Sequence, residues 1–153
     1  MYVHEFEPGP RSAAWTYASV GLWSATHTED GHGLEFFMLA PGQDNRLVEL
    51  LTLAAFFHAG PESQRLDVGH TVPIGEPWLR GSLCNHLLVS LPYTFGPELE
   101  WAEWEGGHAR HLWLLPITEA EREFKVEFGR EALEQRLEDA AVVPTDPQRR
   151  SVA

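Results

Sequence analysis

Apolar and polar residues follow different spacings in different parts of this chain. Between Asn45 and His58, apolar side chains recur at helical intervals around so much of the circumference that little of the helix can face water. Residues 83–91 form a mostly apolar run that is typical of a strand buried on both faces, and residues 108–115 are predicted to be the next strand. The pattern predicts a central helix packed against a sheet.

The first forty residues favour paired strands. Aromatic and β-branched residues dominate residues 14–26, and the Asp30-Gly31 pair leads into the apolar run 34–39, so we predict a β-hairpin. Prolines and glycines interrupt residues 60–81, which predicts a loop with at most one short strand. Residues 101–104 are expected to form an edge strand and residues 106–107 a turn.

The last third of the chain has the clearest local signals. The apolar strand 112–117 runs directly into Thr118, which forms a capping box with Glu121 and begins a helix over residues 119–128. Gly129 ends that helix, a second follows over residues 130–139, and residues 140–153 form a C-terminal tail. Strands and helices alternate irregularly. We therefore predict a single α+β domain over residues 1–153, with a mixed, largely antiparallel sheet.

Several of these segments resemble the suppressor of fused family. The segments at the end of the family's domain correspond to residues 114–121, 129–133 and 146–152 of this chain. The middle section of that domain is similar to residues 69–71 and 87–92. The positions that carry the resemblance are Gly69, Pro116, Thr118, Glu121, Gly129, Asp146 and Arg149.

The resemblance implies the fold of the N-terminal domain of suppressor of fused and a protein-binding module without catalysis. In animals these proteins restrain Hedgehog signalling by binding zinc-finger transcription factors, with the ligand added as a strand between two domains. This chain is long enough for only one such domain. Compact bacterial relatives are associated with polymorphic toxin systems, so the resemblance also implies an immunity protein that neutralises a cognate toxin.

Charge limits the class of partner. Eleven basic and 23 acidic residues give a net charge of −12, which repels phosphate backbones and anionic lipids and favours a basic protein partner. We expect no direct binding to nucleic acid and no membrane span, because the longest apolar run is far shorter than a span requires. Residues 1–10 lack the pattern of a secretory signal, and Cys84 has no second cysteine, so we expect a cytoplasmic protein with Cys84 in its core.

One segment combines carboxylates with tryptophans and is our candidate partner-binding surface. Lys and Arg are absent between Arg80 and Arg110. Strand alternation places residues 101 and 103 on one face and residues 100, 102 and 104 on the other, so at least one tryptophan can stay near solvent. Alternatively, both tryptophans pack inward under an acidic rim. The candidate residues are Glu98, Glu100, Trp101, Glu103, Trp104 and Glu105.

Catalytic and cofactor motifs are absent, so we predict a non-enzyme without a cofactor or metal. The segment 27–32 contains His27, Glu29, Asp30 and His32, which could bind zinc, but such clusters are usual in solvated turns. His70 with Asp67 is a possible imidazole–carboxylate pair, whereas His108 and His111 are expected on opposite faces of a strand.

Two other functions stay open. One is a small metal-dependent hydrolase that uses His27, His32 or His70, and the other is a scaffold protein that self-associates through Trp101 and Trp104. The glutamates and arginines of residues 119–138 are interpreted as a solvated helix face with i,i+4 pairs.

Overall fold

A seven-stranded mixed sheet organises the protein, and the computed structural model describes all of residues 1–153. The strands are β1 (Tyr2–Phe6), β2 (Trp15–Val20), β3 (His32–Ala40), β4 (Thr71–Pro73), β5 (Cys84–Ser90), β6 (Trp101–Trp104) and β7 (Gly107–Thr118). The helices are α1 (Leu22–Thr26), α2 (Asn45–Ala59), the 3-10 turn η1 (Glu62–Gln64), α3 (Pro97–Glu100), α4 (Glu119–Phe128) and α5 (Arg130–Asp139).

Strands β3 and β7 form the centre of the sheet, whose order is β1-β2-β3-β7-β5-β4. They pair in parallel, and every other pair of neighbours is antiparallel. The 12-residue strand β7 has two partners along its second edge, β6 beside its start and β5 beside its end. The predicted α+β class with a mixed, largely antiparallel sheet is confirmed.

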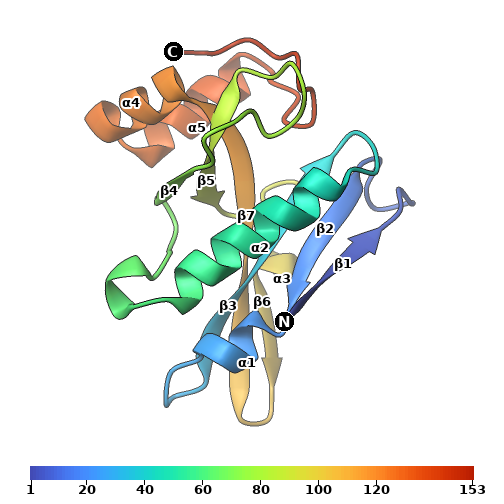
Figure 1. The fold of residues 1–153 in the computed structure, drawn as a ribbon, viewed down its shortest axis with the longest axis vertical. Helices are drawn as coiled ribbons and strands as arrows, with labels where there is room; N and C mark the ends of the chain where they lie inside the picture. Colours follow the sequence, from blue (N-terminus) through green and yellow to red (C-terminus); the bar gives the residue numbers. More distant parts are fainter.

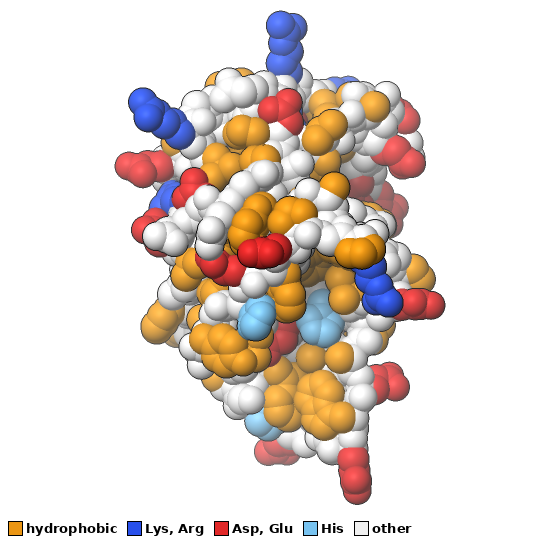
Figure 2. All heavy atoms as spheres, turned by 90° about the vertical axis from the view of Figure 1, so that its right-hand side faces the viewer, with side chains coloured by type: hydrophobic (Ala, Val, Ile, Leu, Met, Phe, Trp, Pro, Cys, Tyr) orange, Lys and Arg blue, Asp and Glu red, His pale blue; other side chains and the backbone are white.

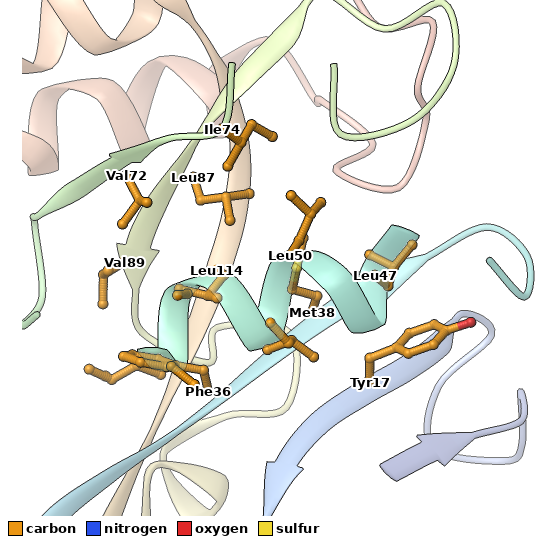
Figure 3. Packing of buried hydrophobic residues seen from close by; sticks show 14 of the residues in the cluster. Tyr17, Phe36, Met38, Leu47, Leu50, Val72, Ile74, Leu87, Val89 and Leu114 are labelled. Atoms are coloured by element: carbon orange, nitrogen blue, oxygen red, sulfur yellow. The ribbon is translucent and has the colours of Figure 1, made fainter. Parts of the chain in front are cut away.

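Both faces of the central strands are buried, because their side chains alternate between two apolar clusters. Phe36 and Met38 of β3 contribute to the cluster beneath α2, together with Leu114 of β7 (Figure 3). Phe37 and Trp113 from the same strands contribute to the cluster on the other face, which α5 and the C-terminal tail cover. This double burial explains why the central strands read as apolar runs.

Helix α2 crosses the first face of the sheet (Figure 1) and has nearly the predicted bounds. The Asp44 carboxylate caps it by accepting from the Arg46 N–H, and the Tyr17 hydroxyl accepts from the Asp44 N–H. The expectation that little of its surface faces water is wrong. Only one side packs on the sheet, and the opposite side exposes Leu53, Phe56 and Phe57.

The predicted hairpin over residues 14–26 and 34–39 is partly wrong. Strands β2 and β3 do pair antiparallel, but residues 22–26 form α1 rather than more strand. The reason is a buried carboxylate on β3. Glu35 accepts hydrogen bonds from the Gly21 and Trp23 backbone N–H groups at 2.9 and 3.0 Å, which satisfies the start of the helix. Strand β1 has no counterpart in the sequence prediction.

The other predicted elements are confirmed within a few residues. β5 and β7 match the predicted strands, β6 is an edge strand, and residues 60–81 contain one short strand, β4. The capping box of Thr118 and Glu121 is present, and α4 and α5 meet at Gly129 as predicted. Cys84 is buried, and burial raises the pKa of its thiol.

A buried ion pair fastens the C-terminal tail to the sheet. Arg149 donates to both carboxylate oxygens of Glu121, at 2.7 and 2.8 Å, and to the backbone oxygen of Pro116 at 2.9 Å. Glu121 also accepts from the Thr118 and Val152 N–H groups. The interpretation of residues 119–138 as a solvated face is therefore wrong for Glu121, which is completely buried.

Burial by itself would raise the pKa of Glu121, but the hydrogen bonds and charge of Arg149 outweigh it and lower this pKa. The carboxylate therefore stays ionised inside the protein.

The remaining family-motif residues shape nearby turns. Gly69 and Gly129 both have positive φ angles, of 90° and 93°, which side chains disfavour. Lys125 donates to the backbone oxygen of Gly69 at 2.7 Å, which links α4 to the loop before β4. Asp146 accepts from the Gln148 N–H at 2.8 Å and so forms the turn that delivers Arg149.

Replacing Arg149 with methionine tests the ion pair. We expect Arg149→Met to lower the free energy of unfolding by about 3–5 kcal/mol, because it leaves a carboxylate buried without a partner. Urea titration measures the loss. Arg150→Met is the matched control, since Arg150 is exposed whereas Arg149 is buried. Equal losses for the two variants would contradict the role given to Arg149.

A second buried polar group lies near the end of α2. His58 is 5% exposed, packs edge-on against Phe36, and accepts from the Leu66 N–H at 2.9 Å through Nδ1. Burial lowers the pKa of His58 from 6.5 to about 4, and the charge of Arg65 acts in the same direction. The folded protein therefore holds the imidazole neutral where the unfolded chain would protonate it.

The free energy of unfolding should depend on pH through His58. Because the unfolded chain takes up the proton first, stability is full above pH 6.5 and falls by about 2–3 kcal/mol as the pH decreases towards 4. Glu121, with its lowered pKa, adds a loss only below its ordinary pKa of 4.5. Urea titrations between pH 4.5 and 7.5 should show a flatter dependence for His58→Gln. The exposed substitution His4→Gln should keep the wild-type slope, and an unchanged slope in His58→Gln would disprove the assignment.

Candidate partner-binding surface

The segment selected from the sequence lies at one end of the molecule. In Figure 1 the turn between β6 and β7, helix α1 and the start of β3 share the lower end, whereas α4 and α5 lie at the upper end. Strand β6 pairs with the first residues of β7, from Trp101 opposite Arg110 to Trp104 opposite Gly107. This end therefore combines three segments that are far apart in the sequence.

Both tryptophans of β6 are partly exposed, Trp101 by 42% and Trp104 by 45%. They contact different groups, as strand alternation predicts. Trp101 lies near the rings of His32 and His108, each 5.8 Å away between centroids. Trp104 instead meets Trp23 of α1 edge-on at 4.8 Å. The alternative of two tryptophans packed inward is not what the structure contains.

Glu100 differs from its prediction in two ways. It ends helix α3 rather than belonging to the strand, so its predicted place in the alternation is wrong. It also accepts from Arg110 at 2.7 and 2.9 Å, while the Arg110 guanidinium lies 5.3 Å from the centroid of the Trp101 ring. Glu100 is therefore neutralised and acts by holding Arg110 against Trp101.

Trp23 is the residue of this surface that the sequence did not reveal. Its indole N–H donates to the backbone oxygens of Gly31 and His108, each at 3.0 Å, and so joins α1 to β3 and β7. The ring occupies the space that side chains would fill at Gly33 and Gly107, where an added Cβ would lie 2.5 Å from it. Residues 14–26 have the pattern of a strand. No neighbouring residue indicates that the Trp23 ring contacts Gly31 and His108.

An open recess of about 430 Å³ lies between the turn that precedes β3 and the β6–β7 turn. Its lining residues are Glu29, Asp30, Glu103, Trp104, Gly106, Gly107 and His108. Glu29 and Asp30 were candidates for a metal site in the sequence, and here they face the partner-binding candidates Glu103 and Trp104. A hydrogen bond from the Thr28 hydroxyl lowers the pKa of Asp30, which keeps that carboxylate ionised.

The charge around the recess is negative. No Lys or Arg lines it, and the lower third of the face in Figure 2 carries hydrophobic, His and acidic side chains without a basic one. Three carboxylates beside a partly exposed tryptophan suit a cationic side chain, through charge attraction and contact with the aromatic ring. Of the other predicted residues, Glu98 and Glu105 are exposed, and neither Trp101 nor Glu100 lines the recess.

The histidines do not assemble into a metal site, and no group of three or more His, Cys, Asp or Glu side chains is placed to hold an ion. His27 stacks on Trp23 at 4.3 Å between ring centroids. Nδ1 of His70 accepts from the backbone N–H of Asp67 rather than pairing with its carboxylate. None of the helices has the length and apolar character that a membrane crossing needs.

Comparison with known proteins agrees with this architecture. The chain is similar to a suppressor of fused homolog from Neisseria gonorrhoeae FA 1090, with 32% identity and a TM-score of 0.82 over 99% of this chain and 77% of that one. A chain of the Sufu–Fu complex has the same fold at 15% identity, with a TM-score of 0.67 over 98% of this chain and 75% of that one.

Drosophila Suppressor of Fused also shares the fold, at 13% identity and a TM-score of 0.69, over 98% of this chain and 42% of its own length. No functionally curated protein sequence matches significantly. The family model described as Suppressor of fused protein (SUFU) matches residues 1–150. The chain therefore belongs to the suppressor of fused family.

Proposed function

We propose that this protein is a non-catalytic binding module whose partner is a basic protein, held at the recess beside Trp104. The observation that carries the proposal is the meeting of Glu29, Asp30 and Glu103 with an exposed tryptophan where no basic residue lines the surface. Tryptophans contribute much of the energy of protein interfaces, and carboxylates speed the encounter with a basic partner.

The comparisons support a protein partner by analogy of fold. One structure with this fold is a complex between Sufu and Fu, so the fold can present a protein-binding surface. The net charge of −12 adds a long-range attraction for basic proteins and a repulsion for nucleic acid.

A cognate toxin is the partner that we propose, which would make this chain a cytoplasmic immunity protein. Nucleases that act on phosphate backbones carry basic surfaces, and an acidic module that covers such a surface would block access to the substrate. Fast capture matters for neutralising an active toxin, and electrostatic attraction is the property that raises association rates.

Reversing charge at the recess tests the proposal. The variant Glu29→Lys/Glu103→Lys/Glu105→Lys reverses two carboxylates of the recess and the exposed Glu105 beside it in the β6–β7 turn. We expect folding to be retained but association with the native partner to slow by about tenfold or more at low salt. The partner is first captured from the native cell with wild-type protein, and rates are then measured by stopped-flow fluorescence over a salt series.

The matched control is Glu76→Lys/Glu123→Lys/Glu127→Lys, which alters the net charge equally through exposed residues away from the recess. A global charge effect slows both variants alike, whereas a site at the recess slows only the first. Equal association rates in the two variants would show that the partner does not bind at the recess.

The toxin partner has its own test. Co-expression of the captured protein should arrest growth, and the wild type and the control variant should restore growth while the recess variant restores it less. A captured protein that has no effect on growth would contradict the immunity role but leave the binding role intact.

A further inference from the structure

A second cleft lies at the opposite end of the molecule, on the sheet face covered by α5. Its volume is about 520 Å³, within the range of sites that bind small ligands or single side chains. Helix α5 forms one wall, the segment after β5 another, and the C-terminal tail around Val142 and Pro144 a third. The cleft shares no lining residue with the recess beside Trp104.

The sheet side of this cleft is apolar and aromatic. Trp113 and Leu115 of β7 line it, with Leu137 from α5. Trp113 is 4% exposed, stacks on Phe37 with an interplanar angle of 7°, and its indole N–H has no acceptor in the protein. A buried donor without a partner is unfavourable. Because this N–H is itself covered, an occupant of the cleft supplies the missing acceptor only if the wall around Trp113 shifts as it enters.

The helix side of the cleft is acidic. Glu131, Glu134 and Glu138 lie on one face of α5, at the spacing that brings helical side chains together. Glu134 is held by the hydroxyls of Ser90 and Tyr93, at 2.7 and 3.0 Å, and by Arg130 at 2.6 Å.

The nearby cations are already engaged. Arg149, which also lines the cleft, is committed to Glu121. Arg130 is committed to Glu134 and the Tyr93 hydroxyl, and its guanidinium also lies 3.7 Å from the Glu131 carboxylate. Glu138 makes no ion pair, so the helix side retains unbalanced negative charge.

We propose that this cleft binds an arginine side chain of a peptide segment. The guanidinium matches the carboxylates of α5, and its planar face suits the exposed aromatic ring of Tyr93, which lines the cleft with Trp113. The carbonyl groups beside the side chain are acceptors of the kind that the Trp113 indole N–H lacks. A simple polyamine offers the charge but neither the plane nor the acceptor.

Two tripeptides test this assignment on the full chain, acetyl-Gly-Arg-Gly-amide and its citrulline counterpart. Citrulline has nearly the same shape as arginine but no charge. Titrations followed by ¹⁵N NMR should shift the Trp113 indole signal, which is assigned from the spectrum of Trp113→Phe. The citrulline peptide should bind at least about fivefold more weakly, because it loses the attraction to the carboxylates.

Glu138→Gln should weaken arginine-peptide binding by about threefold, and Glu127→Gln, an exposed change on α4, should leave it unaltered. Equal binding of the two peptides, tighter binding of spermidine, or the absence of a Trp113 shift at millimolar peptide would overturn the proposal. Shifts centred on the Trp104 signal would assign the arginine to the other recess. The recess variant Glu29→Lys/Glu103→Lys/Glu105→Lys should bind the arginine peptide normally, so the two proposals fail or succeed separately.

Discussion

The central strands β3 and β7 are apolar on both faces, and the need to cover both faces determines the rest of the architecture. Helix α2 covers one face, and α5 with the C-terminal tail covers the other. The tail can do so because Glu121 and Arg149 fix it beneath the end of β7. Neither α2 nor α5 with the tail covers the first residues of β7. Of its first five residues, Gly107 to His111, only Ala109 is buried, and they carry β6 and its two tryptophans beyond α2 and α5.

Charge is distributed unevenly between the two ends. Near α4 and α5, arginines are paired with carboxylates, as in Arg149 with Glu121 and Arg130 with Glu134. At the other end Arg110 is paired with Glu100, while the carboxylates of the recess have no basic lining residue. A protein with few basic residues thus uses several of them for internal pairs. Both surfaces where we propose binding are lined by carboxylates, including Glu138 in one and Glu29, Asp30 and Glu103 in the other, that make no ion pair.

Local patterns in the sequence were sufficient for elements that local physics determines. The capping box at Thr118, the stop at Gly129 and the apolar runs of β5 and β7 are set by neighbouring residues, and all were predicted. Long-range partners explain the errors. The sequence identifies Glu121 as the capping-box partner of Thr118, but only Arg149, 28 residues away, explains its complete burial. Likewise, Glu35 turns residues 22–26 into a helix from a distant strand. Glu29 and Asp30 join the recess only because β3 lies beside β7.

The indole of Trp23, seated over Gly33 and Gly107 and bonded to two backbone oxygens, makes α1, β3 and the β6–β7 hairpin one stiff body. A preorganised body surrenders little conformational entropy when something docks on it, because no loop has to be ordered first. Recognition at this end of the molecule then resembles the fitting of two rigid surfaces, in which only side-chain rotamers adjust.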